Sequence, residues 1–297
     1  MQHVPVLPEE VLHWLDPQIG DVVVDCTFGA GGHSCAFCKA VGATGSVFGI
    51  DADRDALERA RGNTCFKHCS FTPIHGNFRH LTELLEHHHV LRVDRFLFDL
   101  GLSSDQLDTS GRGFSFMRDE PLIMTLSDTQ DEDTVTAEDV VNSWSEESLA
   151  DIIYGFSDER FARRIASHIV AARSEGAITT TGALAEIVIE AIPPRFRNQR
   201  IHPATRTFQA IRMAVNDEVG ALRQALPKAW SVLSSGGRIA VISFHSLEDR
   251  IAKEYFREWS KDGVGRLLVK KPIVPAPVEI SSNPRARSAK LRIIEKI

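Results

Sequence analysis

The sequence predicts an α/β fold in which a largely parallel sheet is interrupted by a helical insertion. Three observations predict it. Short apolar runs alternate with segments of helical periodicity, which is typical of parallel strands covered by helices on both faces. A glycine-rich turn follows the first of these runs. The gap between the fourth and fifth runs is far longer than one crossover helix requires.

Five apolar runs are expected to form the strands, and the C-terminal segment also has strand character. In chain order these segments are 22–26, 46–50, 71–75, 95–100, 238–244 and 287–297. Helices are predicted at 34–41, 53–61 and 78–88. A stripe of apolar residues from Phe208 to Leu226 predicts one long helix ahead of the fifth strand.

The insertion is predicted to be a helical domain at 107–200, and 1–106 with 201–297 are expected to form the sheet domain. Thr136 and Asp139 have the spacing of a capping box at a helix start. Asp158 precedes an apolar stripe and is expected to cap a second helix. A third stripe around Leu184 predicts another helix.

Charge is distributed unevenly along the 297 residues, although the formal net charge is only −6. Segment 119–151 holds eleven acidic residues and no lysine or arginine. In contrast, 261–297 has a net charge of +6 and 190–213 of +4. Basic patches attract phosphate backbones, so RNA is a candidate partner, and a solvated charged face is the alternative.

The sequence shows no apolar run long enough to cross a bilayer and no signal-peptide pattern at its start. We therefore expect a cytoplasmic protein without a membrane partner. The oligomeric state stays open, a homodimer included.

Five cysteines occur, at positions 26, 35, 38, 65 and 69. An odd number without a secretion signal predicts reduced thiols. The spacings Cys35-x2-Cys38 and Cys65-x3-Cys69 would suit zinc, but the first pair falls on a helix predicted to pack on the sheet. We expect buried thiols and no metal.

The turn from Asp25 to His33 reads DCTFGAGGH and is expected to bind a ligand at the carboxyl edge of the sheet. A dinucleotide fingerprint would need glycine at position 34, which is Ser34. The negative Asp25 disfavours a pyrophosphate and suits the cationic amino-acid end of S-adenosylmethionine (SAM). SAM is thus preferred over a nicotinamide dinucleotide, and a tight turn without a ligand is the remaining alternative.

Polar and aromatic residues follow the next strands. Asp51 ends the second strand, where a carboxylate can accept both hydroxyls of an adenosine ribose. Phe78 follows the third and either lies against adenine or belongs to the core. Asp99 ends the fourth, in DLGLSSDQL. By accepting hydrogens from a target amine there, Asp99 would localise the nitrogen lone pair for attack on a methyl group.

The motifs together resemble the bacterial small-subunit ribosomal RNA (cytosine-N4) methyltransferase family. The matching segments are 25–33, 99–107, 112–118, 202–210 and 243–250, with 3–7 and 283–288 at the two ends. The resemblance implies a Rossmann-like class I methyltransferase sheet with an inserted helical domain. It also implies SAM as cofactor and the N4 amine of a decoding-centre cytidine in 16S rRNA of the small ribosomal subunit as target (position 1402 in the family's enzyme name).

The resemblance also implies roles for individual positions. The SAM contacts fall on Gly31, Gly32, His33, Asp51, Phe78, Asp99 and Gln106. The catalytic candidates are Asp99, Ser103 and His245, of which His245 either touches substrate or is a structural histidine. The composition of the chain, and not the resemblance, gives the RNA-binding candidates: arginines and aromatic rings in 112–118 and arginines of the two basic segments, namely Arg112, Phe114, Phe116, Arg118, Arg206, Arg285 and Arg287. For 112–118 a folded surface loop is the alternative.

One segment departs from the family pattern. After Asp119 the family usually continues GPLDMRMD, whereas 120–127 here reads EPLIMTLS and lacks two aspartates and an arginine. This departure supports an alternative function, a non-catalytic RNA-binding or ribosome-assembly protein on the same fold. A nicotinamide-dependent oxidoreductase is the weaker alternative, since the third fingerprint glycine is missing.

Overall fold

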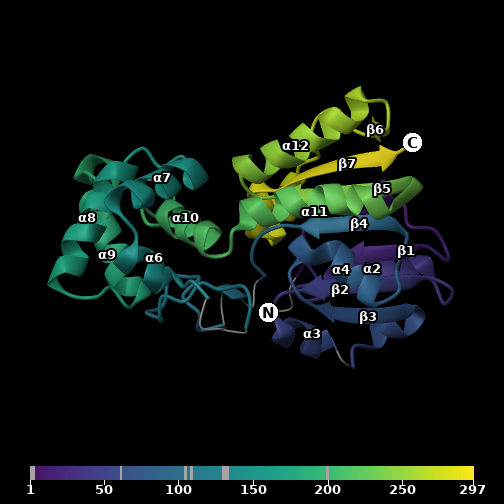
Figure 1. The fold of residues 1–297 in the computed structure, drawn as a ribbon, viewed down its shortest axis with the longest axis horizontal. Coiled ribbons are helices and arrows are strands. Elements are labelled where there is room, and N and C mark those ends of the chain that lie inside the picture. The colour runs from purple at the N-terminus through teal and green to yellow at the C-terminus, as the bar shows by residue number, and fades with distance from the viewer. Residues whose placement is uncertain (1–3, 61, 104–105, 108–109, 129–133, 199–200) are drawn as a thin grey trace. The chain divides into compact units, whose positions relative to one another are not determined.

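The computed structural model describes residues 4–60, 62–103, 106–107, 110–128, 134–198 and 201–297 (Figure 1). The chain divides into two compact units: Met1–Ser103 with Val219–Ile297 (unit 1), and Ser104–Glu218 (unit 2). The predicted insertion is therefore present. Its predicted end at residue 200 is wrong, because helix α10 (Thr205–Val215) packs against α6 (Ala137–Ser143) and α7 (Glu146–Ser157) of unit 2.

Unit 1 contains a seven-stranded sheet in the order β3-β2-β1-β4-β5-β7-β6. The strands are β1 (Val22–Asp25), β2 (Ser46–Asp51), β3 (Ser70–His75), β4 (Val93–Asp99), β5 (Leu233–Ser243), β6 (Gly265–Leu267) and β7 (Lys290–Lys296). The strands β1 to β5 pair in parallel, and β7 pairs antiparallel with both β5 and β6. All six predicted strands are confirmed, and only the three-residue β6 has no counterpart in the prediction.

Helices cover both faces of this sheet. They are α1 (Pro8–Leu15), α2 (Gly32–Val41), α3 (Arg54–Ala60), α4 (Leu81–His87), α11 (Glu218–Val232), α12 (Ser246–Lys261) and α13 (Pro277–Ser282), with the 3-10 helices η1 (Thr64–His68), η2 (Phe78–His80) and η4 (Pro284–Ser288). Consecutive residues of a strand pack into hydrophobic clusters on opposite faces of the sheet. Val24 packs in a cluster with Leu226 of α11 and Phe256 of α12, whereas Val23 packs in a cluster with Phe37 of α2. Because both faces are buried, the strands appear in the sequence as continuous apolar runs.

The long helix predicted ahead of β5 is in fact two helices. Asn216 caps α10, and Asp217 has a left-handed φ of 45° before α11 begins. Asn216 Oδ1 accepts the Leu126 N–H at 2.7 Å, and Asn216 Nδ2 donates to the Met124 carbonyl at 2.8 Å. These contacts to a distant loop interrupt a stripe that looks continuous in the sequence.

Unit 2 is built from α6, α7, α8 (Ala162–Glu175), α9 (Thr181–Ala191), η3 (Pro194–Phe196) and α10. The capping box of Thr136 and Asp139 is confirmed at the start of α6. Asp158 was expected at a helix start, but it is the left-handed residue that ends α7, and α8 begins only at Ala162. The divergent segment 120–127 is folded into this unit, with Leu122 and Met124 buried.

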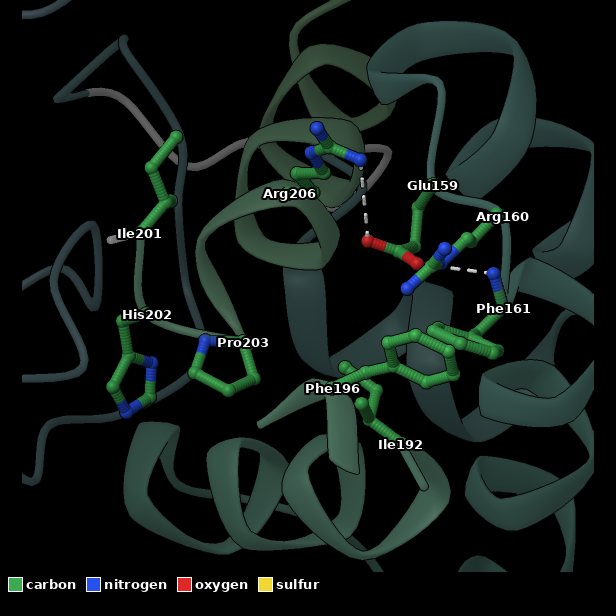
Figure 2. A pocket seen from close by; sticks show the side chains of 9 residues that line it. All are labelled: Glu159, Arg160, Phe161, Ile192, Phe196, Ile201, His202, Pro203 and Arg206. Carbon is green, nitrogen blue, oxygen red and sulfur yellow. Dashed lines mark hydrogen bonds and ion pairs between the residues drawn. The ribbon is translucent and has the colours of Figure 1, made fainter. Parts of the chain in front are cut away.

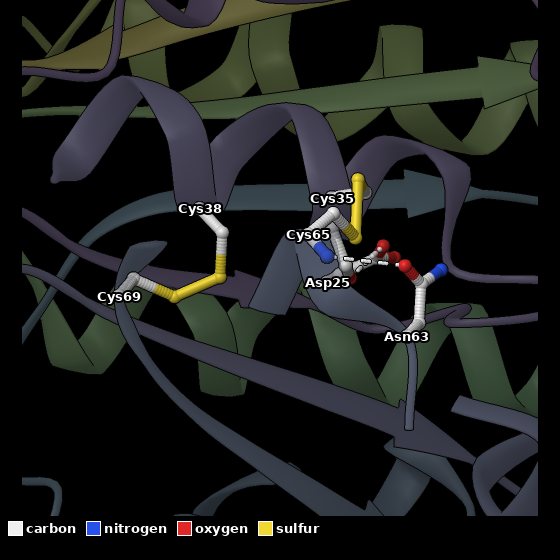
Figure 3. The surroundings of a disulfide bond; sticks show 7 residues. Asp25, Cys35, Cys38, Asn63, Cys65 and Cys69 are labelled. Atoms are coloured by element: carbon white, nitrogen blue, oxygen red, sulfur yellow. Dashed lines mark hydrogen bonds between the residues drawn. A yellow bond between two sulfur atoms is a disulfide. The ribbon is translucent and has the colours of Figure 1, made fainter. Parts of the chain in front are cut away.

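The cysteines depart from the expectation of five reduced thiols. Disulfides join Cys35 to Cys65 and Cys38 to Cys69 (Figure 3). The paired Cα atoms lie 5.6 and 5.0 Å apart, because α2 and η1 pack side by side. Cys26 is the free cysteine, and burial raises the pKa of its thiol well above the ordinary value.

Within the described ranges, no helix combines the length and the apolar character that a bilayer crossing would require.

Candidate active site

Three carboxylates lie at the ends of three adjacent parallel strands in unit 1. Asp25 ends β1, Asp51 ends β2 and Asp99 ends β4, and β1 lies between the other two. The carboxyl ends of parallel strands meet at one edge of a sheet, which is where open α/β folds bind ligands. This edge therefore concentrates negative charge, as the sequence predicts.

The glycine turn after β1 has the backbone that its glycines permit. Gly29 and Gly31 have φ values of 54° and 77°, in the left-handed region that side chains disfavour. A Cβ on Gly31 would lie 2.6 Å from the Phe28 ring, so this position has no space for a side chain. The turn then leads directly into α2, whose first residue is Gly32.

Asp51, at the end of β2, connects the glycine turn to this strand by a hydrogen bond. Its two oxygens accept the N–H groups of Gly29, at 2.6 Å, and of Asp53, at 2.9 Å. Burial raises the pKa of Asp51 to about 6, although both hydrogen bonds act in the opposite direction. A carboxylate offers about four lone-pair positions, so two remain for the ribose hydroxyls that the sequence assigns to it.

Asp25 is only 1% exposed and forms hydrogen bonds within the turn and to the start of α2. Its carboxylate accepts hydrogen bonds from Ser34 Oγ at 2.7 Å and from the Thr27 N–H at 3.2 Å. Burial raises the pKa of Asp25, against the lowering effect of nearby His33. Asp25 therefore has a structural role in addition to its charge, and its hydrogen bond to Ser34 of α2 could not be predicted from the turn sequence alone.

Asp99 is more exposed than Asp25, with 17% of its side chain accessible. Its backbone N–H donates to Thr27 Oγ1 at 2.7 Å, and its Oδ2 lies 3.5 Å from His33 Nε2. Its Oδ1 is buried and accepts no hydrogen bond from any described residue. Burial lowers the pKa of His33, but the adjacent Asp99 and the charge of Asp25 outweigh burial and raise it. Thr27 is a positioning residue that sequence reasoning did not identify.

Ser103 and Phe78 border the same edge. Ser103 Cβ is the atom nearest to a Cβ built on Gly29, at 3.8 Å, which places Ser103 beside the glycine turn. Phe78 packs partly against the core, edge-on to Phe98 at 5.8 Å between ring centroids. Its ring is half-buried, so a core role is established and an adenine contact stays a prediction.

His245 occupies a structural position at the start of α12. Its Nε2 lies 2.9 Å from Oε1 of the buried Glu248, and the other Glu248 oxygen accepts the Phe244 N–H at 3.0 Å. This arrangement joins the end of β5 to α12. Of the two alternatives for His245, the contacts favour the structural one.

Several predicted RNA-binding residues have internal partners in unit 2. Arg112 Nη1 donates to the carbonyls of Thr125 and Leu126 at 3.1 and 3.0 Å. Phe114 is 7% exposed, and Phe116 stacks on His202 at 4.4 Å between centroids. A buried ring cannot stack on a base, so the folded-loop alternative describes Phe114. Arg118 is exposed.

Arg206 borders a cavity of about 340 Å³ within unit 2 (Figure 2). Its guanidinium lies 3.8 Å from Glu159, and Arg160 lies over the ring of Phe196 at 3.9 Å on another part of the lining. Arg160 and Phe196 were not among the predicted site residues, because they come from segments separated by more than thirty residues and meet only in the folded chain.

The basic C-terminal segment has two kinds of residue. Arg285 and Arg287 are exposed on η4. Lys290 and Arg292 contact Asp249 of α12, at 3.4 and 2.6 Å. Gln106 belongs to unit 2 and is 8% exposed, so its contact with the cofactor stays a prediction.

An open sheet with a glycine turn after β1 and acidic side chains at its carboxyl edge has the Rossmann-like architecture found in SAM-dependent methyltransferases. The sequence matches the MraW methylase family over residues 1–297, and the chain belongs to that family. Neither alternative function, a nicotinamide oxidoreductase or a non-catalytic assembly protein, is supported by this match.

Relatives match along their whole length. A ribosomal RNA small subunit methyltransferase H from Geobacter sulfurreducens is 47% identical over 99% of both chains. Proteins of the same name are 45% identical in Syntrophotalea carbinolica (100% of this chain, 98% of the relative) and 41% in Brevibacillus brevis (99% and 98%). A solved rRNA methylase from Streptococcus thermophilus is 11% identical over 98% and 93%, with a TM-score of 0.44, and the assignment does not depend on it.

Proposed function

We propose that this protein transfers the methyl group of SAM to the N4 amine of a cytidine in the decoding centre of 16S rRNA, in the cytoplasm. The position corresponds to 1402 in the family's enzyme name. The names of the full-length relatives support small-subunit rRNA as substrate. The resemblance of segments 99–107 and 243–250 supports the cytosine amine as acceptor.

The observation that carries the proposal is the hydrogen bonding of the two Asp99 carboxylate oxygens. One oxygen lies beside His33, and the other is buried without a hydrogen-bond partner among the described residues. A buried acceptor left unpaired is costly, which indicates that a ligand supplies the donor. An exocyclic amine has hydrogens to donate, and accepting one of them directs the nitrogen lone pair toward the methyl group.

The residues at this edge fit SAM. Bound SAM supplies an electrophilic methyl group on a positively charged sulfur. Asp25, Asp51 and Asp99 give the edge a negative field, which favours a cationic ligand over a pyrophosphate. The first turn of α2, beginning at Gly32, presents backbone N–H groups that suit a carboxylate. Asp51 would accept the ribose hydroxyls with its remaining lone pairs while it accepts the Gly29 N–H.

RNA capture is assigned to exposed arginines of both units. Arg118 and Arg206 lie in unit 2, and Arg285 and Arg287 in unit 1. The cavity beside Arg206 adds aromatic rings and Arg160, a composition suited to unstacked bases and phosphates. Once the target amine is methylated it becomes more acidic, and Asp99 with the adjacent His33 lies where its proton leaves.

The test is single-turnover transfer of labelled methyl from SAM to small ribosomal subunits, followed by digestion to nucleosides and mass spectrometry. We expect N4-methylcytidine at one position. Subunits in which the target cytidine is replaced by uridine, which has no exocyclic amine, are the matched control and should take up no label. A methyl group on another base would contradict the target, and no transfer at all would contradict the reaction.

A further inference from the structure

Four of the five cysteines gather where α2 packs against η1. Cys35 and Cys38 lie one helical turn apart on α2, and Cys65 and Cys69 come from η1 and its C-terminal cap. Figure 3 shows both pairs on the side of α2 that faces η1. The Cα atoms across the two segments are 5.6 Å apart for Cys35–Cys65 and 5.0 Å for Cys38–Cys69.

This arrangement has the features of a four-thiolate metal site. Residues three apart on a helix lie on one face, about 5–6 Å between Cβ atoms, so both α2 sulfurs can reach a common point. The spacings Cys-x2-Cys and Cys-x3-Cys fall within the range of structural zinc sites. A zinc ion in such a site would lie at about 2.3 Å from each of the four sulfurs.

The surroundings also suit such a site. Zinc with four thiolates carries a net charge of −2, and three exposed basic side chains flank the cysteines: Lys39 on α2, and Lys67 and His68 on η1. The Asn63 side chain accepts the Cys65 N–H at 3.1 Å and caps η1, which fixes the loop that carries two of the sulfurs. Positive charge nearby favours the thiolate form that binds metal.

We propose that the reduced cluster of Cys35, Cys38, Cys65 and Cys69 binds one Zn²⁺ ion through four thiolates. The two disulfides and the metal site are alternative states of the same sulfurs. A dithiol reductant supplies two electrons and two protons to each disulfide and is itself oxidised to a disulfide. The four thiols then release four protons as their sulfurs bind Zn²⁺.

The ion would hold η1 against α2 behind the glycine turn. Phe66 of η1 stacks on Phe71 at 3.9 Å between centroids and lies 6.0 Å from Phe28. Phe28 and Phe66 are the rings that a Cβ on Gly31 would meet. Fixing η1 therefore stabilises the aromatic cluster on which the cofactor turn rests, and metal loading is expected to raise the melting temperature.

The test uses the full chain, reduced with a dithiol, freed of metal by a chelator and then titrated with Zn²⁺ under anaerobic conditions. We expect one zinc per chain by elemental analysis. With Co²⁺ in its place, we expect the thiolate-to-cobalt charge-transfer absorption of a tetrahedral sulfur site. X-ray absorption on the zinc form should show four sulfur neighbours at about 2.3 Å.

Variants separate the cluster from other thiols. Cys38→Ser and Cys69→Ser should each lose stoichiometric zinc and the cobalt spectrum, whereas Cys26→Ser, outside the cluster, should keep both. Circular dichroism reports whether each variant is folded. The zinc titration of the unaltered chain tests the proposal even if a variant does not fold. Reduced chain that binds no zinc, or that instead binds iron with acid-labile sulfide, overturns the proposal.

Discussion

His33 Nε2 lies 3.5 Å from Asp99 Oδ2, and this contact links the first turn of α2 to the end of β4. The helix is located by the Ser34–Asp25 hydrogen bond, and the strand end by Thr27 Oγ1, which accepts the Asp99 N–H. The glycine turn, the start of α2 and the end of β4 are therefore connected by hydrogen bonds and close contacts. One oxygen of Asp99 lies beside His33, and the other is buried and accepts no hydrogen bond from the described residues.

Replacing Asp99 by Ala should reduce the single-turnover rate of methyl transfer by about 10²–10³-fold, the range seen when a positioned polar group is removed from a reacting centre. RNA affinity should change far less, because we expect the carboxylate to act where amine and methyl meet. Asp99→Asn should retain part of the rate, since the amide oxygen still accepts a hydrogen bond. Rapid-quench kinetics measure this, and a normal rate for Asp99→Ala would remove Asp99 from the mechanism.

Replacing Asp51 by Ala should raise the dissociation constant for SAM by about tenfold or more, at least ~1.4 kcal/mol, because two ribose hydroxyls lose their acceptor. Part of the loss comes from the Gly29 N–H, which Asp51 holds at 2.6 Å. Isothermal titration calorimetry measures the affinity. Asp55→Ala, an exposed acid on α3, is the matched control and should bind SAM normally.

SAM affinity should fall as the pH is lowered through about 6, the value to which burial raises the pKa of Asp51. Above that pH the carboxylate is ionised and accepts hydrogen bonds with both oxygens. Below it, the proton occupies one acceptor position and weakens the hold on the ribose. Titrations between pH 5 and 8 check this, and Asp51→Asn should flatten the dependence. An unchanged slope in that variant would assign the effect to Asp25 or His33.

The same raised pKa has an opposite consequence for folding. Asp51 binds its proton more tightly in the folded chain than in the unfolded one, so its contribution to stability is present below the ordinary carboxyl pKa and is lost as the pH rises through about 6. Ligand binding and folding therefore respond to pH with opposite sign at this residue.

Reversing the charges of Arg285 and Arg287 should weaken RNA binding and reduce its salt dependence. The log–log slope should fall by about 0.7 for each phosphate of a single strand that these arginines neutralise in the native chain. SAM affinity should not change. Filter binding at several salt concentrations measures the slope. An unchanged affinity and slope would make this part of the tail structural.

Arg292→Gln is the matched comparison. Arg292 contacts Asp249 at 2.6 Å, an interaction that also lowers the pKa of Asp249 against the effect of burial. This variant should lower the melting temperature and leave the salt slope of RNA binding unchanged. The two variants thus compare exposed arginines of η4, which we expect to bind RNA, with an arginine whose ion pair with Asp249 stabilises the fold.

Local patterns were sufficient for much of unit 1. The strands, the glycine turn and the acidic strand ends at Asp51 and Asp99 follow from apolar runs and from residues beside them in the chain. Both faces of the sheet are buried, so the runs are continuous and their ends are sharp. The capping box at Thr136 was predictable for the same reason, since both partners lie within four residues.

The tertiary structure alone decided which side chains meet across long separations. Asn216 reaches Met124 and Leu126 and divides a helix that is continuous by periodicity. Asp249 forms ion pairs with Lys290 and Arg292. The two cysteine pairs join positions about thirty residues apart in the sequence. A sequence shows the chemistry of each side chain and its near neighbours. Whether a charge, ring or thiol is paired depends on how distant segments pack, because hydrogen bonds and ion pairs act over only a few ångströms.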